Sequence, residues 1–154
     1  MVSQLDDKDR ALLREIQGDA TLSLQSLAER LAMSQSTVWR KLQDFDAAGV
    51  VTGRVALVAP AAVDLKVCVI ANITLTNHSE EATAAFQRLV DERPEIMECH
   101  AISGAYDYML KVRVRDVEAY EVFLSRWLLP NPFVASVASG FTLRELKYTT
   151  ALPL

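Results

Sequence analysis

Three short amphipathic helices are predicted in the first fifty residues. Apolar residues recur every three or four positions in segments that begin at Asp6, Ser23 and Ser34, whose side chains are of the kind that cap helix N-termini. Gly18 and Gly49 stand where the first and third of these segments are expected to stop. Two short helices joined by a tight turn, after a supporting helix, predict a helix-turn-helix.

Beyond Gly49 the hydrophobic period changes from helical to alternating. Four alternating or apolar segments and two amphipathic helices follow residue 66 in the order strand, helix, strand, strand, helix, strand. The second of these helices carries apolar residues from Val117 to Trp127, and the last extended segment runs from Val134 to Tyr148. This order predicts an α+β fold whose second domain has the βαββαβ, ferredoxin-like arrangement. The expected domains are a helix-turn-helix at 1–52, a linker strand at 53–65, and a βαββαβ domain at 66–154.

One face of the predicted sheet lacks a cover. The two helices of a βαββαβ unit lie on one side of its sheet, and the other side carries Ile70 and Met109 among polar residues. Because apolar side chains are costly to leave in water, we expect this face or an adjoining edge to form a homo-oligomer.

Composition and charge exclude several classes of protein. The chain has 154 residues and a net charge of −4, so no overall basic field attracts nucleic acid. DNA binding would therefore depend on a local patch, or on several copies acting together. No apolar run is long enough to span a membrane, and MVSQLDDKDR is unlike a signal peptide, so we expect a cytoplasmic protein with no membrane partner.

Cysteine and histidine give little support for catalysis or metal binding. Cys68 and Cys99 have no CxxC spacing, which favours free thiols in a reducing compartment. In the segment Glu98-Cys99-His100, alternate strand residues point to opposite faces, and His78 is expected in a distant loop. We therefore expect no catalytic residues, no metal ligands and no cofactor, and leave redox sensing by Cys99 as a minor alternative.

The third helix carries a polar face that suits DNA. Arg40 and Gln43 have side chains that can make paired hydrogen bonds to base edges, and Ser36 and Thr37 lie near the positive end of the helix. The alternative is an ordinary solvated helix face. The candidate DNA-binding residues are Ser36, Thr37, Trp39, Arg40, Lys41 and Gln43. Trp39 either packs on the first helix or stacks on sugar and base-methyl groups, while Lys41, nearer the apolar edge, contacts phosphate or nothing.

The turn at 103–107 has groups that suit a zwitterionic ligand. Gly104 can adopt a positive φ and lets a ligand approach the backbone, and Asp107 could accept from an ammonium group. Exposed amides of the turn, which includes Ala105 and Tyr106, could hold a carboxylate. The alternative is an ordinary hairpin in which Asp107 caps its own turn.

Taken in order, several motifs resemble the Lrp/AsnC, or feast/famine, family of bacterial and archaeal transcription regulators. The resemblance runs from about Leu5 to about Thr150. The motifs that carry it are Leu5-Asp6-x-x-Asp9-x-x-x-Leu13, Leu27-Ala28, Ser34-Gln35-Ser36-Thr37-Val38, Gly49-Val50-Val51-x-Gly53, Ala59-Pro60-x-x-Val63-x-Leu65 and Glu98-Cys99-His100-x-x-Ser103-Gly104-x-Tyr106-Asp107-Tyr108-x-Leu110-Lys111.

The resemblance implies a winged-helix-like DNA-binding domain, followed by an amino-acid-responsive βαββαβ (RAM) domain. It also implies homodimers that often stack into octamers, each a tetramer of dimers, with effectors bound near the interfaces between dimers. The matching loop in relatives serves the effector response, which favours Gly104–Asp107 as effector-binding residues, with Ser136 and Ser139 as weaker candidates.

Three positions depart from the family pattern. Asp44 stands where relatives more often have a basic residue, Ala32 where they often have Gly, and Phe133 where they usually have Gly. The sequence thus predicts a transcriptional regulator that binds double-stranded DNA, responds to an amino acid or a related small molecule, and controls amino-acid metabolism genes. The alternatives are an architectural DNA-binding protein without an effector and an enzyme built on the βαββαβ domain.

Overall fold

The computed structural model describes residues 5–154, so the first four positions of the predicted first domain lie outside it. The chain forms two compact units. One unit comprises the described part of Met1–Leu57 together with Lys147–Leu154, and the other comprises Val58–Leu146. Across residues 5–154, no helix is both long enough and apolar enough to cross a bilayer.

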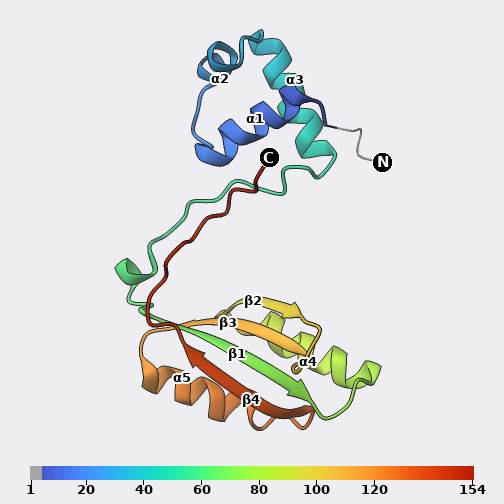
Figure 1. Ribbon diagram of the computed structural model, residues 1–154, viewed down its shortest axis with the longest axis vertical. Coiled ribbons are helices and arrows are strands. Elements are labelled where there is room, and N and C mark those ends of the chain that lie inside the picture. Colours follow the sequence, from blue (N-terminus) through green and yellow to red (C-terminus); the bar gives the residue numbers. More distant parts are fainter. Residues whose placement is uncertain (1–4) are drawn as a thin grey trace. The chain divides into compact units, whose positions relative to one another are not determined.

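Each of the three N-terminal helices begins at the predicted cap. Asp6 accepts a hydrogen bond from the Asp9 amide in a reciprocal capping box, while the hydroxyls of Ser23 and Ser34 accept from backbone amides 3.1 and 3.2 Å away. Gly49 follows the third helix with φ +69°, the left-handed stop that the sequence predicted. The helices are α1 (Asp7–Gly18), α2 (Leu24–Leu31) and α3 (Gln35–Ala47), shown in Figure 1.

Apolar residues from all three helices form the core of the first unit. The side chains buried there are Leu12, Leu13, Leu27, Ala28, Val38 and Phe45. The tight turn from α2 to α3 passes through Ala32, whose φ of 50° lies in the left-handed region. This conformation is strained for alanine, and it explains why a glycine suits the position.

The C-terminal tail packs on this helical unit. The Gln17 side-chain amide accepts a hydrogen bond from the Leu152 amide (2.7 Å) and donates one to the Leu152 carbonyl (3.4 Å). Leu154 packs against the helical core. The expected boundaries assigned this tail to the second domain, and the structure instead groups it with the first unit. A tail without regular structure has no periodicity that indicates which surface it contacts.

The predicted linker strand is absent from the structure. Residues 53–59 have neither helical nor strand structure, and a single 3₁₀ turn, Pro60–Val63, follows them. Val55, Leu57 and Val58 are 81%, 63% and 64% exposed. An apolar alternating segment becomes a strand only when a neighbouring strand satisfies its backbone, and this segment has no such neighbour within the described chain.

The second unit has the predicted βαββαβ topology. Its strands form one antiparallel sheet in the order β2-β3-β1-β4. Figure 1 shows α4 and α5 on the same face of this sheet. The elements are β1 (Val67–Leu75), α4 (Glu80–Glu92), β2 (Ile96–Ala101), β3 (Tyr108–Val114), α5 (Val117–Phe123), a π-helical turn (Leu124–Leu128) and β4 (Val134–Phe141).

Two element boundaries differ from the prediction. The last helix becomes a π-helical turn after Phe123, where one continuous helix through Trp127 was expected. The last strand ends at Phe141 rather than continuing to Tyr148. Beyond Phe141 the chain leaves the sheet after one further hydrogen bond, from the Thr142 amide to the Cys68 carbonyl.

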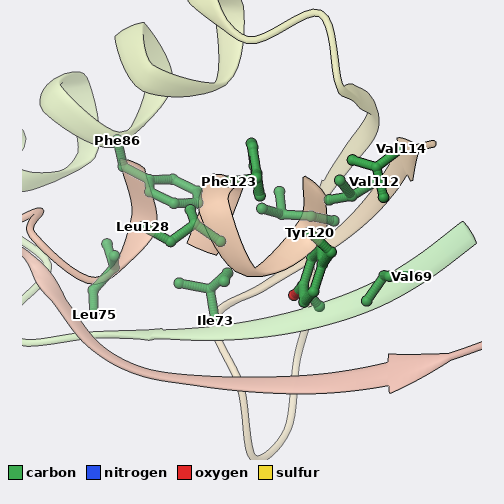
Figure 2. Close-up of a cluster of buried hydrophobic side chains, with 11 residues drawn as sticks. Val69, Ile73, Leu75, Phe86, Val112, Val114, Tyr120, Phe123 and Leu128 are labelled. Atoms are coloured by element: carbon green, nitrogen blue, oxygen red, sulfur yellow. The ribbon is translucent and has the colours of Figure 1, made fainter. Parts of the chain in front are cut away.

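Alternate residues of β1 bury one face of the sheet under the helices. Val69, Ala71 and Ile73 are fully buried, as the alternating pattern predicted. Figure 2 shows Phe86 of α4 and Leu128 of the π-helical turn close to Ile73, and Tyr120 of α5 close to Val69. The Tyr120 hydroxyl lies 2.6 Å from the Ser139 hydroxyl, so this buried ring has a polar partner.

The opposite sheet face is not covered by a helix of this unit. Ile70, Asn72 and Thr74 of β1 are all partly buried there. Met109 lies next to Asn72 in the register of β1 and β3, and is partly buried too. This mixture of apolar and polar side chains is the surface that the sequence predicted for self-association.

Candidate DNA-binding and effector-binding sites

The polar face of α3 is open to solvent. Ser36, Arg40 and Gln43 are exposed, while Val38 and Phe45 on the opposite side are buried. Trp39 is 55% exposed, so its indole is not buried in the helical core. The predicted candidates therefore include three polar side chains and one aromatic ring that are accessible on a single helix.

The N-terminus of α3 presents a cluster of hydroxyl groups. The Ser34 hydroxyl lies 3.0 Å from that of Ser36 and 2.8 Å from that of Thr37. Thr37 is partly buried, and its amide donates to Ser34. Hydroxyls at the positive end of a helix suit the oxygens of a phosphate.

Lys41 occupies a position different from the other candidates. Its ammonium group forms a hydrogen-bonded ion pair with Asp9 of α1 and lies 3.6 Å from a carboxylate oxygen of Asp6. The Lys41 side chain is only 17% exposed. The hydrogen bond that the Lys41 ammonium donates to Asp9 raises the pKa of Lys41, so the charged form is favoured. The sequence grouped Lys41 with the DNA-binding residues, and the structure pairs it with the helix that supports α3.

The turn between β2 and β3 offers unused backbone donors. Gly104 has φ +126°, a conformation that L side chains rarely adopt. Within the described chain, the amides of Gly104, Ala105 and Tyr106 donate no hydrogen bond, and Gly104 and Ala105 are exposed. Successive free N–H groups in a turn form a concave site that suits an anion such as a carboxylate.

Asp107 anchors this turn to the end of β1. Its Oδ2 accepts a hydrogen bond of 2.7 Å from the Leu75 amide, and its Oδ1 lies 2.8 Å from His78 Nε2. The hydrogen bond from Leu75 is the main cause of a lowered pKa of the Asp107 carboxyl, with a further contribution from His78. Both carboxylate oxygens therefore already have protein partners, although a carboxylate can accept more than two hydrogen bonds.

His78 lies in the loop that follows β1, and its partner is Asp107 rather than a residue of the Glu98-Cys99-His100 segment. Ile73 pairs with Tyr108 across β1 and β3, so the residues just after β1 and just before β3 lie at the same end of the sheet. The strand order could have indicated this contact, because His78 follows β1 and Asp107 precedes β3. The separation of His78 and Asp107 by 29 positions in the sequence does not by itself indicate that they are in contact.

The two serine candidates lie on different faces of β4. Ser139 pairs with Ala71 and contacts Tyr120, which places it on the helix-covered face. Ser136 pairs with Thr74, on the uncovered face, close to the strand end that Asp107 anchors. The structure therefore brings Ser136 towards the β2–β3 turn, and gives Ser139 a structural partner instead.

The Glu98-Cys99-His100 segment is arranged as the alternation predicted. Glu98 lies 2.7 Å from Lys111 and 3.4 Å from His100, and Lys111 is the main cause of a lowered Glu98 pKa. Cys99 points to the other side, and burial raises the pKa of its thiol, which disfavours a reactive thiolate. Among residues 5–154 no three His, Cys, Asp or Glu side chains are placed to hold a metal ion.

Both units match known protein families. Residues 5–52 match a family described as winged helix-turn-helix DNA-binding, and residues 68–152 match the Lrp/AsnC ligand binding domain. The chain belongs to the Lrp/AsnC family. It is accordingly a DNA-binding transcriptional regulator with an N-terminal helix-turn-helix domain and a C-terminal α+β domain.

Individual relatives cover almost the whole chain. The DNA-binding transcriptional activator DecR of Escherichia coli is 36% identical over 150 residues, covering 97% of this chain and 99% of DecR. An AsnC family transcriptional regulator from Agrobacterium tumefaciens has 38% identity, a TM-score of 0.91 and 96% coverage of both chains. A Neisseria meningitidis transcriptional regulator, solved in complex with L-methionine, has 32% identity, a TM-score of 0.93 and 97% coverage of both chains.

Proposed function

We propose that this Lrp/AsnC regulator binds double-stranded DNA through the polar face of α3 in the major groove. Arg40 and Gln43 would make hydrogen bonds to base edges, Ser36 and Thr37 would contact phosphate oxygens, and Trp39 would pack on sugar or base-methyl groups. The observation that carries this proposal is the exposure of four of these side chains, while Val38 and Phe45 of the same helix are buried. The exposed four are Ser36, Trp39, Arg40 and Gln43.

In this proposal Lys41 supports α3, the helix that contacts DNA. Its ion pair with Asp9 holds α3 against α1, so Lys41 fixes the orientation of the helix without contacting DNA. Arg40 then remains the basic residue of α3 that is available to the duplex. A single helix with so little positive charge binds weakly, because salt-sensitive affinity grows with the number of phosphates neutralised.

We infer that the protein acts as a homodimer formed through the uncovered sheet face or an adjoining edge, and that such dimers can stack into an octamer of four dimers. The partly buried Ile70 and Met109 on that face support self-association. Two linked helix-turn-helix units raise the DNA affinity through effective concentration, and their half-sites would be about 34 Å apart along the duplex.

The β2–β3 turn is our candidate for the effector site. The free amides of Gly104, Ala105 and Tyr106 would bind the α-carboxylate of an amino acid, and Asp107 would accept a hydrogen bond from its ammonium group. The Neisseria meningitidis relative solved with L-methionine supports an amino acid as the ligand class. The target genes would then be genes of amino-acid metabolism. The protein would act in the cytoplasm, by binding and not by catalysis.

Selection from a random duplex library tests the DNA-binding proposal. The full chain should enrich a sequence with two related half-sites, and Arg40→Ala should abolish its sequence-specific shift. Arg14→Ala, which removes an exposed arginine of α1, is the matched control and should leave the shift unchanged. An architectural protein would instead enrich no sequence, and that result would overturn specific recognition.

A thermal-shift panel of the twenty amino acids tests the effector proposal. A ligand present at 100 times its dissociation constant adds about 2.7 kcal/mol of apparent stability. Ala105→Pro removes one free turn amide without removing an observed hydrogen bond, so it should weaken the response, and Gly104→Ala provides a second variant. If no amino acid shifts the melting curve, or none changes DNA affinity by the 5-fold or more typical of allosteric coupling, the effector proposal is wrong.

A further inference from the structure

A cavity lies at the far end of β3 from the β2–β3 turn. It has a volume of about 590 Å³, within the range of small-molecule sites. Tyr108 begins β3 next to the turn, and Val114, which ends the strand, lines the cavity. At the rise of a β-strand these ends are about 20 Å apart, so the cavity is separate from the proposed effector site.

The cavity is rich in arginine. Its lining includes Arg93, Arg113, Arg115 and Arg126 together with the acids Glu95 and Glu118. Three of the arginines form ion pairs with acids beside the cavity: Arg93 with Glu92, Arg113 with Glu145 and Arg115 with Asp116. The hydrogen bond that the Arg115 guanidinium donates to Asp116 raises the pKa of Arg115. A guanidinium carries five N–H donors, so Arg93 and Arg126 can still bind carboxylate groups of a ligand.

Two of these guanidinium groups are arranged around one indole. The Arg93 guanidinium lies 3.7 Å from the centre of the Trp127 ring, and that of Arg126 lies 5.5 Å from it. The Arg93 side chain is only 21% exposed. Stacking on an aromatic ring fixes a guanidinium in one orientation, which reduces the entropy lost when it binds a carboxylate.

Glu95 has an unsatisfied oxygen in the cavity wall. Its Oε2 is buried and has no hydrogen-bond partner among the described residues. An unpartnered buried carboxylate oxygen costs free energy that a donor would recover. The terminal torsion of a glutamate is soft, so a small rotation would present this oxygen to a positively charged group in the cavity.

We propose that this cavity binds an acidic α-amino acid, L-glutamate or L-aspartate. Arg93 and Arg126 bind its carboxylates, and Glu95 accepts a hydrogen bond from its ammonium group. The proposal stands on the cavity alone and does not depend on the effector role of the β2–β3 turn. Glu95 and Glu118 would repel a phosphate, which argues against phosphate or nucleic acid as the occupant.

Calorimetric titration of the full chain at constant ionic strength tests this assignment. L-Glutamate should bind with one site per chain in the cavity, at least tenfold tighter than glutarate, which lacks the ammonium group, and tighter than inorganic phosphate. Arg126→Gln should weaken L-glutamate at least tenfold. Glu95→Gln should remove most of the preference for L-glutamate over glutarate. Arg88→Gln, an exposed arginine of α4 outside the cavity, is the matched control and should behave as the parent.

Several results would overturn the proposal. They are the absence of L-glutamate and L-aspartate binding, equal affinities for glutamate and glutarate, tighter binding of phosphate, or unchanged glutamate binding in Arg126→Gln. The Ala105→Pro variant separates the two sites, because the cavity site should survive in it. Failure of the turn as an effector site would therefore leave the cavity result intact.

Discussion

Our proposal gives the neighbouring residues Arg40 and Lys41 of α3 different roles, and one pair of variants tests this assignment. Lys41→Met leaves the partly buried Asp9 without its cation, so we expect it to lower the free energy of unfolding of the helical unit by about 1–2 kcal/mol. Arg40→Ala should leave this stability almost unchanged, because Arg40 is exposed. Chemical denaturation of both variants measures the difference.

DNA binding supplies the second readout for the same pair. Loss of a phosphate or base contact reduces affinity and its dependence on salt, whereas loss of a supporting ion pair does not change the number of phosphates contacted. Under conditions where both variants are folded, we therefore expect Arg40→Ala to lower the DNA affinity. We expect Lys41→Met to keep the parental dependence of DNA affinity on salt concentration. A lower slope for Lys41→Met would show that Lys41 contacts phosphate.

The Asp107 carboxyl sets the response of the β2–β3 turn to acid. Its pKa is lower in the folded chain because the ionised form accepts from Leu75 and His78. Its stabilisation is therefore complete above the ordinary aspartate pKa of about 3.9, and is lost as the pH falls through the lower, folded value. An NMR titration of the Leu75 amide should show a midpoint below 3.9, and a midpoint at or above 3.9 would contradict the hydrogen bond.

The sequence predicted the roles of residues that depend on near neighbours in the chain, and not those that depend on distant ones. Asp6, Ser23 and Ser34 cap helices because their role depends on neighbours within three positions. The Lys41–Asp9 and His78–Asp107 pairs join residues 32 and 29 positions apart, so they depend on how elements pack. The sequence therefore indicated the exposed polar face of α3 and placed Lys41 nearer its apolar edge, but it did not indicate the ion pair of Lys41 with Asp9.

At the scale of elements, the C-terminal tail tests whether a segment without regular structure stabilises a helical domain. Leu154 packs against the core of the first unit, whereas Leu143 is 99% exposed. Leu154→Ala should destabilise this unit by about 1 kcal/mol through lost apolar burial, and Leu143→Ala should have no measurable effect. Hydrogen exchange of the α1 amides reports the change, and equal protection in both variants would show that the tail contact contributes nothing.

Periodicity predicted elements where both the pattern and a partner exist. The alternating residues of β1 pair with β3 and β4, and this strand was predicted correctly. Val55, Leu57 and Val58 belong to an equally apolar segment but have no neighbouring strand in the described chain, so they remain irregular. The π-helical turn after Phe123 also escaped prediction, because a one-residue change in hydrogen-bond register leaves the apolar stripe nearly unaltered.

At the scale of the whole molecule, a substitution that prevents self-association should also lower the DNA affinity. Ile70→Glu places a charge on the uncovered sheet face, where it would be costly to desolvate in a subunit interface. We expect this variant to sediment as a monomer and to lose about 100-fold or more in DNA affinity, because linking two DNA-binding helices raises the affinity by that much through effective concentration. Val117→Glu, at a 60% exposed position of α5, is the matched control and should remain oligomeric. A monomeric Ile70→Glu variant with parental DNA affinity would show that one helix-turn-helix suffices, and would separate assembly from DNA recognition in this protein.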